Sequence, residues 1–394
     1  MKKILLVTDG GLPLPAIDGG AVETLINDYL DLNEKTDDFK FDVFSCYSKN
    51  LKKIKLCNYN NSNFYYINTS TIKYKFYKCI NGILRKIFKF NINHCFANLV
   101  LKQCNKNEYD LVLIENSPSL VNSFYKRYGN KIILHLHNDF LNKNTLFGEK
   151  IIDNCKKILT VSEFVKNKVD EIKPNEKTLV IYNGIDLKKF DYKKINIDKR
   201  KRLIEKYNIS ENDFLILFTG RVCDDKGVKE LLLAFSKIQA KYNNVKLLIV
   251  GGSFYCNYKT DGYIRELKKI AKNFEEKIIF TGYIEHNDMP MIYSLGNILV
   301  LPSKIDDSCP LTILEGMAMG LPIIASNCGG IPEEVNEKNS ILLDRNNLIN
   351  DIYDSIEILI KKQIDINQMK KESILLSKKF DVIDYSKNML DILK

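Results

Sequence analysis

The sequence predicts an α/β protein built from two doubly wound domains, each a parallel sheet with helices on both faces. Short apolar runs alternate with helix-like stretches along most of the 394 residues, and they do so in two series. The charged segment 188–206, which is poor in apolar residues, separates the series. We therefore expect one domain over 1–187 and a second over 188–376. A last helix within 377–394 is expected to cross back to the first domain.

The first series opens with a strand, a glycine-containing loop and a helix. A strand is expected at 3–8, because residues 4–7 are all apolar, as in a parallel strand buried on both faces, and the segment leads into Gly10-Gly11. Apolar residues then recur at helical spacing over 21–32. Further strands are expected at 41–45, 111–115, 131–137 and 156–161.

The second series repeats this alternation after residue 206. Strands are expected at 214–219, 246–250, 277–281, 298–301, 323–325 and 340–343. Helices are expected at 229–242, 262–273, 310–319 and 382–393. Because open α/β sheets bind ligands at the carboxyl ends of their strands, two such domains imply a cleft between those ends.

Composition and charge narrow the class of protein. The 59 basic and 49 acidic residues give a net charge of +10, which favours phosphates or anionic lipid heads as partners. Ten cysteines occur without a CxxC pair, as expected of reduced thiols in the cytosol. The apolar run at the amino terminus stops at Val7, and no run reaches the length that spans a bilayer. We expect a cytoplasmic protein, at most peripheral on the inner face of the cell membrane.

Two histidines are candidates for the active site. His135 and His137 alternate along one strand, so both point to the same face at its carboxyl end. The alternative is that one or both are hydrogen-bonded core residues. The chain has only four histidines, and none stands at metal-ligand spacing from cysteines, histidines or carboxylates. We therefore expect no metal and no other cofactor.

Two segments have the features of phosphate sites. Gly19-Gly20 opens the first long helix, where backbone amides and the helix dipole favour an anion, although a plain tight turn is the alternative. The spacing is not GxGxxG, so a dinucleotide site is not supported. Arg221 and Lys226 flank a strand-to-helix loop and would suit a diphosphate, the alternative being solvated surface charges.

A third candidate segment is 302–322. Pro310 can open a helix, which leaves the amides of Leu311 and Thr312 free for an anion. Glu315 follows in the second turn among apolar neighbours, so a buried carboxylate there would need a hydroxyl pair such as a ribose. A solvated helix charge is the alternative.

These motifs together resemble the retaining family 4 glycosyltransferases of GT-B fold, which have two Rossmann-like domains. Arg221 with Lys226 is similar to their Arg-x4-Lys diphosphate clamp, and Asp307 to Glu315 resembles their E-x7-E element. The other similar stretches are 320–333, 183–190, and Gly19-Gly20 with Glu23. The resemblance covers almost the whole chain and is strongest over 214–345.

The resemblance implies roles for individual residues. Glu315 would bind the nucleotide ribose, Asp307 the donor sugar, and His137, in preference to His135, would lie near the transferred sugar. Backbone atoms near Tyr283 and Ile284 would contact the base. The sequence departs from the family at Asp307, where Glu is usual, and at Ser308-Cys309-Pro310, which replaces Gly-Phe-Gly. These departures leave the donor sugar open.

The resemblance also implies a reaction. A sugar would pass from a nucleoside diphosphate sugar, with UDP favoured, to an acceptor hydroxyl with retention at the anomeric carbon. The leaving phosphate would help to deprotonate the acceptor, so neither a metal nor a protein nucleophile is expected. Bacterial surface polysaccharide or glycolipid assembly is the expected setting. The alternatives are a non-catalytic partner subunit of the same fold, a sugar-nucleotide epimerase and a phosphorylase.

The segment 73–89 suggests where the acceptor comes from. It has six basic residues and no acidic one, interleaved with aromatic and aliphatic side chains. Such a segment suits an anionic membrane surface, and hence a lipid-linked acceptor. The alternative is a packed helix with a solvated basic face. Nucleic acid is not expected as a partner, because no binding motif accompanies the segment.

Overall fold

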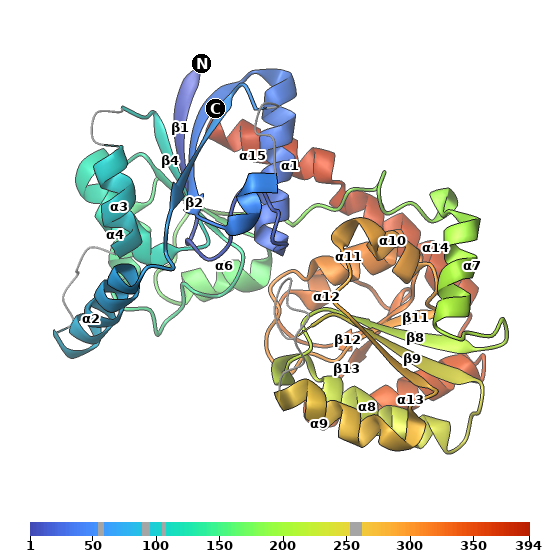
Figure 1. Cartoon of the computed structure of the whole chain (residues 1–394). Coiled ribbons are helices and arrows are strands. Elements are labelled where there is room, and N and C mark those ends of the chain that lie inside the picture. Colours follow the sequence, from blue (N-terminus) through green and yellow to red (C-terminus); the bar gives the residue numbers. More distant parts are fainter. Residues whose placement is uncertain (54–58, 89–94, 105–107, 253–261) are drawn as a thin grey trace. The chain divides into compact units, whose positions relative to one another are not determined.

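The computed structural model describes the whole chain except residues 54–58, 89–94, 105–107 and 253–261 (Figure 1). The chain divides into two compact units. The first consists of Met1–Asn183 together with Ile383–Lys394, and the second is Gly184–Val382. Each unit contains one parallel sheet with helices packed against it. The predicted fold class, two doubly wound α/β domains, is therefore confirmed.

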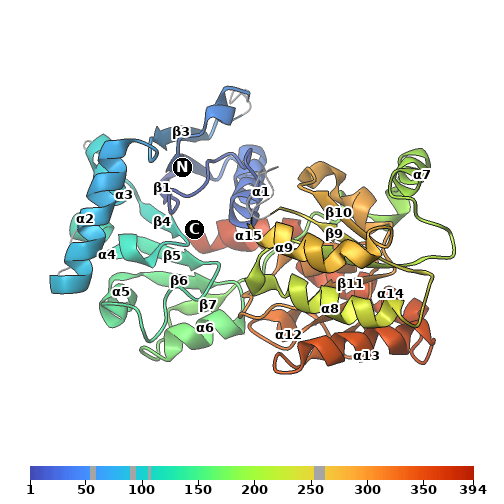
Figure 2. The ribbon, with the colours of Figure 1, turned by 60° about the horizontal axis from the view of Figure 1, so that its bottom comes forward.

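The sheet of the first unit has seven strands in the order β3-β2-β1-β4-β5-β6-β7. Figure 2 shows β1, β4, β5, β6 and β7 in succession. Their bounds are β1 Lys2–Val7, β2 Phe39–Cys46, β3 Ser62–Ile67, β4 Leu111–Glu115, β5 Ile132–Leu136, β6 Lys157–Thr160 and β7 Thr178–Val180. Strands β3 and β7 were not predicted from the sequence. Both are edge strands, and β3 alternates between exposed and buried residues, so neither forms the continuous apolar run by which buried strands are recognised.

The helices of the first unit are α1 Ala21–Thr36, α2 Ile72–Phe88, α3 Cys95–Gln103, α4 Pro118–Tyr128, α5 Gly148–Asn154, α6 Glu163–Asp170 and the greater part of α15 Val382–Leu393. Helix α1 is one turn longer than the predicted 21–32. Asn33 explains the difference, since its buried amide exchanges two 3.0 Å hydrogen bonds with the backbone of Phe39. The helix then ends at Asp37, which is left-handed (φ 54°).

The second unit has a six-stranded sheet in the order β10-β9-β8-β11-β12-β13. The strands are β8 Phe214–Thr219, β9 Val245–Val250, β10 Ile278–Gly282, β11 Ile298–Leu301, β12 Ile323–Ser326 and β13 Ser340–Leu343. The helices are α7 Ile197–Lys206, α8 Val228–Gln239, α9 Gly262–Ala271, α10 Met289–Tyr293, α11 Leu311–Ala318, α12 Ile331–Glu334, α13 Leu348–Ile360 and α14 Ile366–Ser377. All six strands predicted for this part of the chain are present.

Alternate residues of the interior strands in the second unit belong to two different cores. Along β8, Leu215 and Leu217 pack into the core beneath α10, α11 and α14, whereas Ile216 and Phe218 pack into the core beneath α8, α9 and α13. Figure 1 shows these two groups of helices on opposite faces of the sheet. Because both faces are covered, the interior strands β8, β11 and β12 are apolar along almost their whole length.

The strand order reverses once in each sheet. Strand β1 lies between β2 and β4, and β8 lies between β9 and β11. In open parallel sheets ligands bind at this switch point, outside the carboxyl ends of the strands. In the first unit Glu115 ends β4, and in the second Arg221 follows β8 and Asp307 follows β11.

Two further features bear on the predictions. Among the residues that the structure describes, no helix has both the length and the apolar character needed to cross a bilayer. The eight cysteines in the described part of the chain are all free.

Candidate functional site

The loop after β8 carries the first predicted cation, Arg221. Strands β8 and β9 end with their backbones in close contact, because a Cβ on Gly251 would lie 1.9 Å from the Gly220 oxygen. Arg221 follows directly and is partly buried. Within the described residues its guanidinium has no hydrogen-bond or ion-pair partner. All five of its N–H donors are therefore available to a ligand.

Lys226 and Asp307 are brought together by the structure. The Lys226 ammonium donates to Oδ1 of Asp307, and Oδ2 of Asp307 accepts from the hydroxyl of Ser303. Gly227 follows Lys226 at φ +66°, where a Cβ would lie 1.9 Å from the Pro302 oxygen. This close approach of the β8 loop to the end of β11 places Lys226 beside Asp307.

The segment Ser308-Cys309-Pro310, which replaces the Gly-Phe-Gly of the family, packs onto residues 329–334. The backbone amide of Gly330 donates to the backbone carbonyl oxygen of Asp307 at 2.7 Å, and Ser308 is buried. Cys309 donates its thiol proton to Oε1 of Glu334 at 3.0 Å. Burial raises the pKa of Glu334 well above its ordinary value.

Helix α11 begins after Pro310 and contains Glu315. In the described structure the backbone amides of Leu311 and Thr312, in its first turn, make no hydrogen bond, which suits an anion. Glu315 is 5% exposed, so it is not a solvated helix charge. Its Oε2 accepts from the Tyr293 hydroxyl at 2.7 Å, and its Oε1 lies 2.8 Å from Nε2 of His286.

The remaining predicted residues of the second unit lie after β10. Ile284 packs against the core that contains α10 and α11, and the Tyr283 hydroxyl lies 3.5 Å from the carboxylate of Glu285. Nδ1 of His286 lies 2.8 Å from the Lys189 ammonium. The carboxylate of Glu315 is thus joined to a chain of polar groups.

Gly19 and Gly20 lie at the start of α1, in the first unit. Gly20 has φ +106°, and a Cβ there would lie 2.1 Å from Oε2 of Glu23 and 2.7 Å from Leu12. The Glu23 carboxyl therefore covers this helix start. Burial raises the pKa of Glu23 to about 7, with the nearby Asp9 and Glu115 acting in the same direction.

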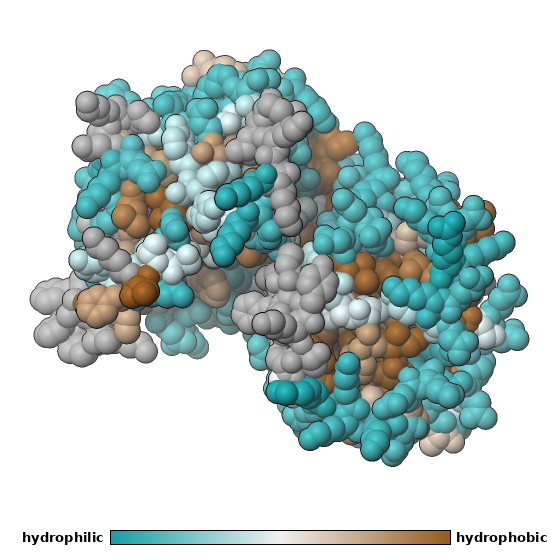
Figure 3. Space-filling model, viewed as in Figure 1, coloured by the Kyte–Doolittle hydropathy of each residue, from teal (hydrophilic) through white to brown (hydrophobic). Residues whose placement is uncertain are grey.

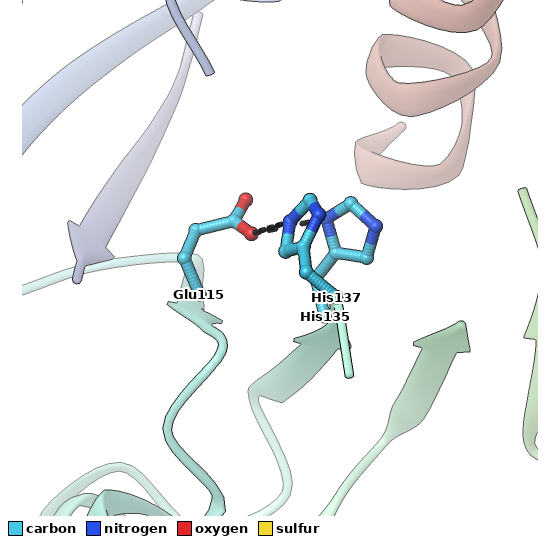
Figure 4. Close-up of side chains that lie close together, drawn as sticks. All are labelled: Glu115, His135 and His137. Atoms are coloured by element: carbon cyan, nitrogen blue, oxygen red, sulfur yellow. Dashed lines mark hydrogen bonds and ion pairs between the residues drawn. The ribbon is translucent and has the colours of Figure 1, made fainter. Parts of the chain in front are cut away.

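The two candidate histidines converge on a carboxylate at the carboxyl ends of β4 and β5 (Figure 4). Glu115 is the register partner of His135 in the sheet. Its Oε2 lies 3.0 Å from Nε2 of His137 and 3.0 Å from Nδ1 of His135. Its Oε1 accepts from the Tyr29 hydroxyl at 2.9 Å. All these side chains are buried or nearly so.

The charges in this cluster follow from burial and from the short contacts. Burial alone would raise the pKa of Glu115, but the two imidazoles outweigh it and hold that pKa well below its usual range. Burial, with a contribution from His135, lowers the pKa of His137 to about 4. At neutral pH Glu115 is therefore ionised and His137 is neutral.

The same three residues could hold a metal ion. Glu115, His135 and His137 offer one oxygen and two nitrogens that all lie within 4.8 Å of one another, and no other such group occurs among the described residues. Two histidines and one carboxylate suit zinc or ferrous iron. The spacing along the sequence hides this group, because Glu115 ends β4, whereas His135 lies in β5 and His137 directly follows it.

Among the side chains that contact the predicted residues, Glu115, His286 and Tyr293 were not predicted from the sequence. Glu115 is a carboxylate that ends an otherwise apolar strand, and this is a signal that the sequence offered. His286 and Tyr293 lie in short polar and apolar stretches without a motif. Only their contacts with Glu315 in the structure identify His286 and Tyr293 as candidate site residues.

Comparison with known proteins identifies the family. The family model for glycosyl transferases group 1 matches 199–375, and the model for glycosyltransferase family 4 matches 76–189. YtcC of Bacillus subtilis (strain 168), which is named as a glycosyltransferase, is 27% identical over 380 residues, covering 94% of this chain and 86% of that protein. The lipopolysaccharide 1,2-N-acetylglucosaminetransferase of Salmonella typhimurium (strain LT2) is 29% identical over 231 residues, covering 58% and 57%.

Solved structures show the same fold. Anabaena HepE, in complex with UDP and glucose, superposes with a TM-score of 0.75 at 18% identity, covering 100% of this chain and 99% of that one. The two parallel-sheet units, the residues that follow β8 and β11, and the two family models all indicate the same family. The chain belongs to the group 1 glycosyltransferases and has the GT-B fold.

Proposed function

We propose that the protein is a retaining hexosyltransferase that moves a sugar from a nucleoside diphosphate sugar, with UDP favoured, to an acceptor hydroxyl. The observation that carries the proposal is the convergence of Lys226 and Asp307 at the switch point of the second sheet. The UDP bound by HepE and the transferase activity in the name of the Salmonella relative support a nucleotide-sugar donor. That relative also supports polysaccharide or glycolipid assembly as the setting.

The donor diphosphate would be held by charges that the unit already presents. Arg221 would donate two parallel hydrogen bonds, Lys226 would act as a point charge, and the amides of Leu311 and Thr312 would complete the site. Lys226 would exchange the Asp307 carboxylate for a phosphate. Asp307 would then be free to accept a hydroxyl of the donor sugar, and Glu315 to accept the ribose hydroxyls.

These groups would stabilise the negative charge that develops on the leaving diphosphate. The bond between the anomeric carbon and the diphosphate oxygen breaks, and the acceptor oxygen bonds to the same face of that carbon. The acceptor proton passes to the leaving phosphate. No protein nucleophile is required, and because two cations and two amides neutralise the phosphates, the proposal includes no metal.

A thermal-shift panel tests the donor site. UDP-, GDP- and ADP-sugars, with free UDP and GDP, are added to the protein in EDTA. A ligand at ~100 times its Kd adds about 2.7 kcal/mol of stability, which raises the midpoint visibly. We expect a shift with uridine nucleotides that Lys226→Ala loses. A folded sample that shifts with none of them would favour a non-catalytic partner subunit.

Product analysis tests the reaction. With the donor so identified, an α-linked donor sugar should give an α-linked product by NMR. A β-linked product would overturn retention, and a free nucleotide sugar changed at one carbon would favour an epimerase. Transfer that EDTA abolishes and Mg²⁺ restores would overturn the metal-free proposal.

We further propose that α2 binds an anionic membrane surface, which would give access to a lipid-linked acceptor. Ile72, Phe76 and Tyr77 are 87%, 63% and 49% exposed, and Lys75 and Lys78 are exposed beside them. Figure 3 shows apolar atoms at the surface of the described part of α2. Residue 89, and the side chains of 73 and 83–88, lie outside the described residues. The proposal therefore rests on the first half of the helix.

A further inference from the structure

The contacts of Glu115 decide which nitrogen of His137 carries a proton. Oε2 of Glu115 lies 3.0 Å from Nε2 of His137 in hydrogen-bond geometry, and a carboxylate can only accept. The proton of the neutral ring must therefore be on Nε2. Nδ1 is left as a lone-pair acceptor.

The backbone of His137 is held from the same side. Asn116, the residue after Glu115, has φ +53°. Its side-chain oxygen accepts from the His137 amide at 3.1 Å, and its own amide donates to the His135 oxygen at 2.7 Å. Glu115 thus fixes the ring of His137, and Asn116 fixes its main chain. Asn116 must be left-handed to do so, a conformation that non-glycine residues rarely adopt.

Nδ1 of His137 is buried and has no hydrogen-bond partner among the described residues. An unsatisfied buried acceptor costs free energy, and a bound group with an O–H or N–H would remove that cost. A sugar offers hydroxyls, which are donors without charge. The other candidate ligand for the cluster, a metal ion, would instead take the Nε2 position that already faces Glu115.

We propose that Glu115 is a positioning residue that holds the His137 proton on Nε2, so that Nδ1 accepts a hydrogen bond from a sugar hydroxyl. The identity of the hydroxyl rests on the proposed function. The tautomer of His137 and its dependence on Glu115 do not, because they follow from the contacts in the first unit alone.

The tautomer is measured directly by NMR on the full chain labelled with 15N-histidine. Four histidines give few resonances, and His137→Asn assigns the one of interest. We expect a protonated Nε2 and an unprotonated Nδ1 at pH 7 in the wild type. In Glu115→Gln the amide can donate to Nε2, so the other tautomer or a mixture should appear. Tyr29→Phe removes only the hydrogen bond to Oε1 and should leave the tautomer unchanged.

Kinetics test whether Glu115 acts through His137. We expect Glu115→Gln to lower kcat about 10- to 100-fold, the scale of a misplaced reacting group, with the donor KM changed less than about 3-fold. In a His137→Ala background the same substitution should change kcat less than about 2-fold.

Three results would overturn the proposal. One is a wild-type proton on Nδ1, which needs no variant to observe. Another is full additivity of the two substitutions in kcat. The third is stoichiometric zinc or iron in the purified protein that Glu115→Gln lacks. Absence of transfer from every nucleotide sugar, with the expected tautomer present, would reject the proposed function and leave the positioning role of Glu115 standing.

Discussion

The ammonium of Lys226 donates to the carboxylate of Asp307, although the two residues are 81 positions apart in the chain. Both side chains are largely buried, at 17% and 15% exposure, so the pair is poorly screened by solvent. Each of the two residues is proposed to bind a different part of one donor. Donor binding would therefore have to separate them.

Asp307→Asn should affect nucleotide binding and turnover in opposite directions. Removing the carboxylate charge releases Lys226, so we expect UDP to bind about 3- to 10-fold more tightly by calorimetry. Sugar transfer should fall by more than about 10²-fold, because the contact with the donor sugar is lost. Asp306→Asn is the matched control, since that carboxylate pairs with Arg345 at 2.9 Å. Weaker UDP binding by Asp307→Asn would contradict the exchange of partners by Lys226.

Loss of either proposed phosphate ligand should abolish most of the activity. We expect Arg221→Ala and Lys226→Ala each to lower kcat/KM by well over about 10²-fold, the effect of removing one preorganised charge donor. Lys229→Ala is the control, because the half-buried Lys229 on α8 pairs with Glu266 at 2.9 Å and has no role in the proposed site. Initial rates of UDP release would show the difference. Near wild-type turnover in both variants would exclude the diphosphate clamp.

Stability should fall between about pH 4.5 and 7 because of Glu23. Its pKa is raised from 4.5 to about 7 on folding, so the folded state binds this proton more tightly than the unfolded state. The contribution of Glu23 to the free energy of unfolding is complete at low pH. It is lost as the pH rises through 7, and the loss is on the order of 3 kcal/mol. Glu23→Gln should therefore match the wild type near pH 4 and exceed it at pH 8.

Urea denaturation of both proteins at each pH measures this difference. Comparing the two at the same pH removes the opposing contribution of His137, whose lowered pKa makes the fold more stable as the pH rises from about 4 to 6.5. Parallel stability curves for Glu23→Gln and the wild type would show that Glu23 does not retain its proton on folding.

Gly227 should not tolerate a side chain. Its φ of +66° and the Pro302 oxygen, 1.9 Å from an ideal Cβ, predict that Gly227→Ala destabilises the protein by on the order of 3 kcal/mol. Nucleotide binding should also weaken, because Lys226 precedes this turn. Gly262→Ala is the control, since no atom of the described residues lies within 4 Å of an ideal Cβ there. Equal midpoints of thermal unfolding for the two variants would refute the steric argument.

The membrane proposal for α2 predicts flotation with anionic vesicles. We expect the protein to float with phosphatidylglycerol vesicles at low salt, less at high salt, and not with phosphatidylcholine alone. Phe76→Ser should reduce flotation several-fold. Phe140→Ser, which removes another exposed phenylalanine of the first unit (55%), should not. Flotation that is indifferent to lipid charge would count against an electrostatic membrane surface.

The fold could be predicted from the sequence because each interior strand is recognisable by its own continuous apolar run. Strands such as β8 are apolar on both faces, whereas the edge strands β3 and β7 lack that pattern and were missed. Local motifs likewise predicted Arg221, Lys226, Asp307 and Glu315 as candidates, and the structure joins Lys226 to Asp307. Glu115 could have been noticed as a carboxylate that ends an apolar strand. The contacts of Glu115 and Tyr293 could not be predicted, because they depend on which residues face each other across strands and helices.

The return of α15 to the first unit has a consequence for the order of folding. Tyr385, Met389, Leu390 and Leu393 are buried, so a nascent chain that ends before residue 383 leaves the apolar surface they cover open to water. The second unit, by contrast, is one continuous stretch. During synthesis it can complete its core first, and the unit that emerges first from the ribosome is the one that matures last.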